Sequence, residues 1–102
     1  LEAEPCDGWL HILELSVHPD AQRRGHARAL IGTAVAHARA MGLARISLTT
    51  DREIPFNGPM YRRMGFAELP ADARPDWLEA LLRREAAAGL DPARRVAMAR
   101  TP

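Results

Sequence analysis

A basic turn near the start of the chain has the residue types of an anion-binding site. Gln22-Arg23-Arg24-Gly25-His26-Ala27-Arg28 follows a short apolar segment and leads into a helical pattern. Free backbone N–H groups at a helix start bind anions, aided by the positive end of the helix dipole. Gly25 has no Cβ, so a ligand can approach the backbone, and successive N–H groups in such a turn form an anion-binding nest. The turn therefore predicts a phosphate or pyrophosphate site, with added charge from Arg23, Arg24 and Arg28.

Two blocks of sequence together resemble a known family. Gln22-x-x-Gly25-x-Ala27, after a segment ending Leu15-Ser16-Val17-x-Pro19, resembles the acetyl-CoA pyrophosphate loop of the GNAT superfamily of N-acetyltransferases. Downstream, Asn57-Gly58-Pro59-Met60-Tyr61-Arg62-Arg63-Met64-Gly65-Phe66 resembles the Asn…Tyr-x-x-x-Gly-Phe segment of that family. Two matched blocks at a suitable distance, with a strand and a helix pattern between them, argue against coincidence.

The resemblance implies acetyl-CoA as acyl donor and assigns residues to it, with no metal. The loop formed by Gln22, Arg23, Arg24, Gly25, His26, Ala27 and Arg28 would hold the pyrophosphate. The strand edge at Leu15, Ser16 and Val17 would pair with the pantetheine arm and direct an N–H group at the developing oxyanion. Asn57 and Tyr61 complete the expected cofactor-binding set. Asn57 is equally interpreted as the cap of its own helix.

Two side chains are the candidates for proton transfer. By the resemblance, Tyr61 lies near the CoA sulfur, where a phenol is a suitable acid because it stays protonated at neutral pH. Glu14 is the only carboxylate inside the central strand, and some family members use a Glu there as general base, directly or through water. The structural alternatives are a core tyrosine and a solvent-facing or cross-strand-paired glutamate. For His11 the sequence shows no partner at an informative spacing.

The segments that position these residues follow from hydrophobic periodicity. Residues 9–17 predict a strand whose apolar phase changes near residues 13–15, as a β-bulge would produce. A helix over residues 26–41 ended by Gly42 and a strand over residues 44–50 complete a βαβ unit, so the two strands should be parallel with a right-handed crossover. The expected fold class is α/β (α+β): the GNAT acyl-CoA N-acyltransferase fold, a mixed sheet around this central parallel unit.

The flanking segments carry weaker signals. Residues 1–8 predict a loop or the end of a truncated hairpin. A short helix is expected from the Asn57 cap to Gly65, and a longer one from residue 75 or 76 to residue 88, where Asp76 and Glu79 have capping-box spacing and Gly89 ends the helix. Residues 94–100 predict a last strand.

Length and composition limit the function classes. With 102 residues the chain is one domain at most, and we expect it to be the C-terminal, cofactor-binding portion of a GNAT domain that lacks most acceptor-binding elements. A net charge of +1 argues against nucleic acid or an anionic membrane as partner. Cys6 is the single cysteine, which excludes an intramolecular disulfide, and we interpret it as an unreactive thiol. The absence of a signal-peptide pattern or a long apolar run, and basic residues that are all Arg, lead us to expect a bacterial, cytoplasmic protein.

Three functions compete. The first is an enzyme that transfers acetyl from acetyl-CoA to a primary amine, small molecule or peptide, by direct attack on the thioester. The second is a non-catalytic acyl-CoA-binding or regulatory domain, and the third is another nucleotide-phosphate binder, for which no Gly-rich nucleotide motif occurs. Tyr61 favours the first, because a pure binder needs no phenol beside the sulfur. The sequence fixes neither the acceptor nor the oligomeric state, and a homodimer stays open.

Overall fold

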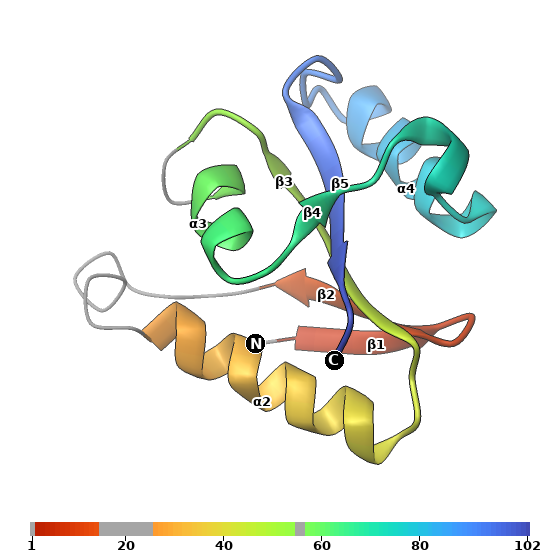
Figure 1. Cartoon of the computed structure of the whole chain (residues 1–102). Helices are drawn as coiled ribbons and strands as arrows, with labels where there is room; N and C mark the ends of the chain where they lie inside the picture. The colour runs from red at the N-terminus through yellow and green to blue at the C-terminus, as the bar shows by residue number, and fades with distance from the viewer. Residues whose placement is uncertain (1, 15–25, 55–56) are drawn as a thin grey trace. The chain divides into compact units, whose positions relative to one another are not determined.

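The computed structural model describes residues 2–14, 26–54 and 57–102. The elements are β1 (Glu2–Cys6), β2 (Trp9–Glu14), α2 (His26–Ala40), β3 (Arg45–Asp51), α3 (Gly58–Arg63), β4 (Ala67–Glu68), the 3₁₀ helix η1 (Ala71–Ala73), α4 (Asp76–Ala87) and β5 (Arg95–Arg100) (Figure 1). Their strands form a mixed sheet in the order β1-β2-β3-β5-β4, which confirms the expected fold class. The chain divides into two compact units, Leu1–Leu48 with Arg100–Pro102, and Thr49–Ala99.

The first unit opens with an antiparallel hairpin of β1 and β2. Asp7 and Gly8 connect the strands, both with positive φ (51° and 86°), as an Asp-Gly hairpin turn requires. The hairpin alternative for residues 1–8 is therefore confirmed. Glu2 pairs with Glu14 but Ala3 pairs with Ile12, so Leu13 is an extra residue in β2. This shift of register lies within the segment where a bulge is expected.

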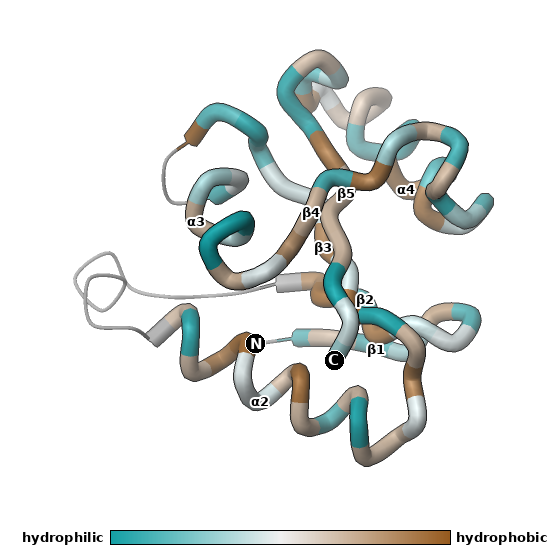
Figure 2. Tube along the Cα trace, viewed as in Figure 1, coloured by the Kyte–Doolittle hydropathy of each residue, from teal (hydrophilic) through white to brown (hydrophobic). Residues whose placement is uncertain are grey.

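Helix α2 buries one apolar face, which contains Ala27, Ile31, Ala34, Val35 and Ala38. Figure 2 shows hydrophobic and hydrophilic residues alternating along this helix, as the 3.6-residue period predicts. The helix ends at Ala40, one residue before the expected end. Gly42 has a φ of 69° and Leu43 N donates to Ala38 O at 2.9 Å, which confirms a glycine C-cap.

Strands β2 and β3 run parallel, with Leu10 opposite Ile46 and His11 opposite Ser47. The predicted βαβ unit is therefore confirmed. Leu10 and Ile46 are almost fully buried, at 1% and 0% exposure. Leu10 also lines a small cavity with Ala34 of α2 and Ala3 of β1, so this side of the hairpin faces the helix.

The second unit is built on β5, whose residues Val96, Ala97, Met98 and Ala99 are all buried. The predicted strand at the end of the chain is therefore confirmed. The two-residue strand β4 pairs with it antiparallel, with Glu68 opposite Met98. The sequence does not predict β4 or η1, because two or three residues are too few to show a period.

Helix α4 confirms the expected helix, but the expected capping box is wrong. Pro75 occupies the N-cap position and no side chain caps the helix. Asp76 is then the first helical residue, too late to act as the cap, and Glu79 pairs with Arg74 instead, at 2.5 Å. At the other end Gly89 has a φ of 100°, as expected for a glycine that ends a helix.

The described residues contain neither a membrane-spanning helix nor a cluster of metal-ligating side chains. None of the helices in residues 2–14, 26–54 and 57–102 is long and apolar enough to cross a membrane. The same residues contain no group of three or more His, Cys, Asp or Glu side chains that could hold a metal ion.

Candidate functional site

The expected cofactor loop lies at the start of α2, but most of it is outside the described residues. Leu15, Ser16, Val17, Gln22, Arg23, Arg24 and Gly25 all belong to that part of the chain. The structure describes the helix start that follows, where His26 is the first residue of α2 and the first turn contains no acidic residue. The positive end of this helix dipole is therefore not neutralised by a carboxylate of its own first turn.

Ala27 and Arg28 are the two predicted loop residues whose side chains are described. Ala27 is buried, at 2% exposure. A small side chain suits this position because the start of α2 is closely packed there. Arg28 is exposed. Its position on the first turn of α2 fits the expected contribution of positive charge near an anion.

Glu14 is the last residue of β2, so the structure places its backbone but does not describe its side chain. The residue opposite Glu14 in the hairpin is Glu2, another acidic residue. The role of Glu14 as general base stays a prediction.

Helix α3 begins where the sequence predicts. Asn57 is its N-cap residue, and Asn57 O accepts a hydrogen bond from Tyr61 N at 2.9 Å. The predicted N-cap position of Asn57 is therefore confirmed, although its side chain makes no capping hydrogen bond. A Cβ on Gly58 would lie 2.8 Å from the backbone oxygen of Arg52. Glycine is required there because the helix start passes so close to the backbone that follows β3.

Tyr61 lies on the inner face of α3 and is 7% exposed. Its ring meets Phe66 edge to face, with 5.8 Å between ring centroids and 68° between ring planes. Gly65, with a φ of 91°, reverses the chain, and Phe66 N then donates to Tyr61 O at 3.0 Å. The Tyr-x-x-x-Gly-Phe pattern is thus a helix end that folds the phenylalanine back onto the tyrosine.

Burial raises the pKa of the Tyr61 phenol above its ordinary value, because a phenolate would lose its hydration. The hydroxyl group therefore stays protonated at neutral pH. It forms no hydrogen bond with another described residue. A catalytic acid and a core tyrosine share these properties.

A buried polar pair in the first unit is absent from the sequence-based prediction. His11 Nδ1 and Ser47 Oγ lie 2.8 Å apart, and the two residues are 3% and 0% exposed. They stand opposite each other on the parallel strands β2 and β3. Only the strand register brings them together, because no local spacing relates residues so far apart in sequence.

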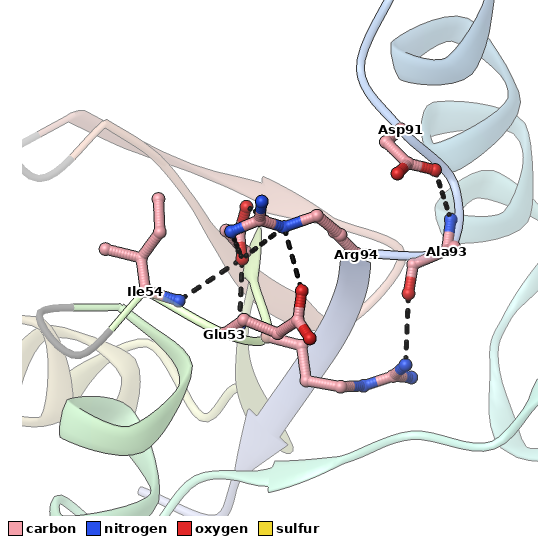
Figure 3. A network of polar contacts seen from close by, with 7 residues as sticks. Glu53, Ile54, Asp91, Ala93 and Arg94 are labelled. Carbon is pink, nitrogen blue, oxygen red and sulfur yellow. Dashed lines mark hydrogen bonds and ion pairs between the residues drawn. The ribbon is translucent and has the colours of Figure 1, made fainter.

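A network of polar contacts after β3 includes Glu53, Ile54 and Arg94 (Figure 3). Its centre is the carboxylate of Asp51. Its Oδ1 accepts hydrogen bonds from Glu53 N at 2.8 Å and Ile54 N at 3.3 Å. Its Oδ2 lies 3.1 Å from Arg94 Nε, and Arg94 also pairs with Glu53 at 3.1 Å. The pKa of Asp51 is lowered, first by the hydrogen bond from Glu53 N and then by Arg94 and Ile54 N, against an opposing effect of desolvation.

Cys6 is half-buried. Desolvation raises the pKa of its thiol, and the nearby Glu4 raises it further. A thiol with a raised pKa is a poor nucleophile, in agreement with the expectation of an unreactive cysteine.

Comparison with known proteins gives the family. The model of the acetyltransferase (GNAT) family matches residues 2–66. Mycothiol acetyltransferase from Cellulomonas flavigena is 41% identical over 61 residues, which are 60% of this chain and 18% of that protein. The chain therefore spans less than a fifth of that relative.

Solved structures agree on the fold. The chain is similar to the ribosomal-protein-S18-alanine N-acetyltransferase from Escherichia coli, with a TM-score of 0.65, 19% identity, and coverage of 97% of this chain and 57% of that one. It is also similar to N-acetylglutamate synthase from Neisseria gonorrhoeae in complex with coenzyme A and N-acetyl-glutamate, with a TM-score of 0.73, 20% identity, and coverage of 97% and 22%. The matched residues 2–66 include the central βαβ unit and the Tyr-x-x-x-Gly-Phe segment, and the chain belongs to the acetyltransferase (GNAT) family.

Proposed function

We propose that the protein transfers an acetyl group from acetyl-CoA to a primary amine. Membership of the acetyltransferase (GNAT) family supports acetyl transfer, and a structural neighbour of the same fold was solved with coenzyme A. In the proposal the turn from Gln22 to Arg28 binds the pyrophosphate. Leu15, Ser16 and Val17 pair with the pantetheine arm. The side chain of Asn57, which makes no capping hydrogen bond to α3, contacts the same arm.

The proposed reaction is direct attack of the amine on the thioester. A neutral amine adds to the carbonyl carbon, the tetrahedral oxyanion is stabilised by a backbone N–H group of the strand edge, and the C–S bond then breaks. The amine loses a proton to Glu14, directly or through water, and the thiolate gains one from Tyr61. Acid catalysis of this kind requires a group that is protonated at neutral pH and can donate.

The observation that carries the proposal is the state of Tyr61. Its ring is buried against Phe66, its pKa is raised by that burial, and its hydroxyl donates to no other described residue. A phenol in this state still has its proton when a thiolate forms. A domain that only bound acyl-CoA would need the ring for packing but not the hydroxyl group.

The test is the change Tyr61→Phe in the full-length protein, because Phe keeps the ring and removes only the hydroxyl. We expect turnover, followed as CoA thiol release with a panel of primary amines, to fall about 10²- to 10⁴-fold. Acetyl-CoA affinity should change little, and the melting temperature should reflect about 1 kcal/mol at most.

Phe66→Leu is the matched control, since it removes the ring contact and leaves the hydroxyl. It should lower stability more than Tyr61→Phe does and lower turnover less. Turnover of Tyr61→Phe within a few-fold of the parent would refute the role of Tyr61. Tight acetyl-CoA binding by the parent with no thiol release for any amine would favour the non-catalytic acyl-CoA-binding domain instead.

A further inference from the structure

The second unit contains a cavity with a basic wall. Its volume is about 240 Å³, and it is lined by four arginines, Arg52, Arg74, Arg83 and Arg95, together with Leu82, Ala86 and Pro92. No carboxylate is among these lining residues. At about 30 Å³ per water molecule, the space corresponds to roughly eight waters, which is enough for a small metabolite.

Two of the four arginines are held in place by partners that do not line the cavity. Arg74 donates from Nε to Leu69 O at 3.0 Å and pairs through Nη1 with Glu79 at 2.5 Å. Arg95 pairs through Nε with Glu85 at 3.2 Å and donates from Nη2 to Thr49 Oγ1 at 3.2 Å. Among described residues, Nη2 of Arg74 and Nη1 of Arg95 have no partner. Both guanidinium groups are thus oriented while still having N–H groups to donate.

The other two arginines differ in their pairing. Arg52 lies 3.2 Å from Glu68 and donates from Nη1 to Ala93 O at 3.1 Å. Arg83 is exposed on α4 and pairs with no other described residue. The four guanidinium groups are therefore balanced by three carboxylates, those of Glu68, Glu79 and Glu85, and Glu68 also pairs with Arg62.

We propose that this cavity binds a small organic anion through its carboxylate or phosphate group. A planar guanidinium matches both groups with paired N–H donors, and hydrogen bonds between charged partners are about twice as strong as neutral ones. The apolar wall of Leu82, Ala86 and Pro92 fits a short apolar portion of the same ligand. The site shares no residue with the proposed acetyl-CoA site, so it extends the proposed function rather than depending on it.

The test uses the full chain and two matched probes, phenyl phosphate and benzoate, at constant ionic strength. Calorimetry should show saturable binding, and the side-chain Nε–H resonances of Arg74 and Arg95 should shift in NMR spectra over the same concentrations. Inorganic phosphate should bind more weakly than phenyl phosphate, because it cannot use the apolar wall. The tighter of the two organic probes identifies the preferred acidic group.

Arg83→Gln is the informative variant, because Arg83 has no partner whose loss would disturb the fold. It should weaken binding of the tighter probe about tenfold. Arg84→Gln makes the same charge change at the next position of α4, outside the cavity lining, and should change affinity less than twofold. The variant Gly25→Val should bind the probe as the parent does, which separates this cavity from the proposed pyrophosphate loop.

Three results would overturn the proposal. They are an absence of saturable binding, an equal effect of the changes at positions 83 and 84, and loss of binding in Gly25→Val. Equal affinity for phenyl phosphate and inorganic phosphate would overturn the assignment of an organic ligand. Acetyl-CoA binding is measured separately on the same variants, so a failure here is distinguishable from a failure of the proposed function.

Discussion

The two units of this chain use different interactions for the same purpose of fixing a helix against strands. In the first unit, α2 buries its small and branched side chains, and Ala34 of this helix lines a cavity together with Leu10 of β2. In the second, arginine–carboxylate pairs connect residues in or next to β3, β4, α4 and β5, as between Arg94 and Asp51 or Arg95 and Glu85. The first type of stabilisation scales with buried area and the second with charge state and salt. The two units should therefore respond to different perturbations.

The largest effect is expected from truncating the apolar core of the first unit. Leu10→Ala should reduce the free energy of unfolding by about 2 to 5 kcal/mol, because it removes a fully buried side chain and leaves a cavity. Chemical denaturation measures this value. Leu13→Ala is the control on the same strand, where the side chain is 52% exposed, and it should cost about 0.5 kcal/mol or less. An equal cost at both positions would show that the first unit is not held by this core.

A second change separates ligand binding from chemistry. Gly25→Val should weaken CoA binding about 100-fold, or roughly 3 kcal/mol, because a side chain at this position would obstruct the approach of the pyrophosphate to the backbone. Circular dichroism should stay near that of the parent, and Tyr61→Phe should bind CoA normally. Unchanged CoA affinity of Gly25→Val in calorimetry would contradict the assignment of the pyrophosphate to this turn.

Acid should affect the second unit first. The pKa of Asp51 is lowered in the folded chain. For Glu68, desolvation alone would raise the pKa, but the hydrogen bonds from Arg62 and Arg52 outweigh it, so this pKa is lowered as well. A carboxylate with a lowered folded pKa stabilises the fold above its unfolded pKa, and this contribution is lost as pH falls through the folded value. Stability should thus decline below about pH 4.

Hydrogen exchange at pH 7 and below pH 4 locates this loss. Amides around β3, β4 and β5 of the second unit should lose protection before those of α2. Asp51→Asn should be less stable than the parent at pH 7 and should lose less on acidification. Earlier loss of protection in α2 would reverse the contrast between the units.

The sequence predicts best where one physical signal dominates. The period of α2, the strand near the end of the chain and the glycines at positions 42, 65 and 89 each required a single interpretation, and the structure confirms all of them. At α4 two signals competed, because Pro75 and Asp76 are both suited to a helix start. Pro75, whose ring fixes φ, occupies the N-cap position. The capping box of Asp76 and Glu79 therefore does not form.

The candidate site was predictable only as far as local motifs extend. Tyr61, Gly65 and Phe66 are close in sequence, so the helix end that joins them follows from their spacing. The pair of His11 and Ser47, and the arginine-lined cavity, depend on strand register and on side chains from separate segments. The arginines that form ion pairs are also spread through the sequence without a period. The net charge of +1 therefore gives no sign that the ion pairs among described residues lie in the second unit.

The smallest expected effect concerns ion pairs within the second unit that differ in exposure. Arg62 and Glu68 form a pair whose side chains are 43% and 32% exposed, whereas those of Arg95 and Glu85 are 20% and 16% exposed. An exposed pair contributes about 0.2 to 1 kcal/mol, because solvent screens it and ordering two long side chains costs entropy. A double-mutant cycle with Arg62→Gln and Glu68→Gln should give a coupling energy in this range. That energy should decrease between about 0.05 and 0.5 M salt, because the Debye length shortens as salt is added.

The same cycle for Arg95 and Glu85 should give a larger coupling energy that salt reduces less, because water and ions reach that pair less easily. If the exposed pair coupled more strongly than the half-buried one, the charge network would not be what distinguishes the second unit from the first, and packing on β5 would be the better explanation for its stability.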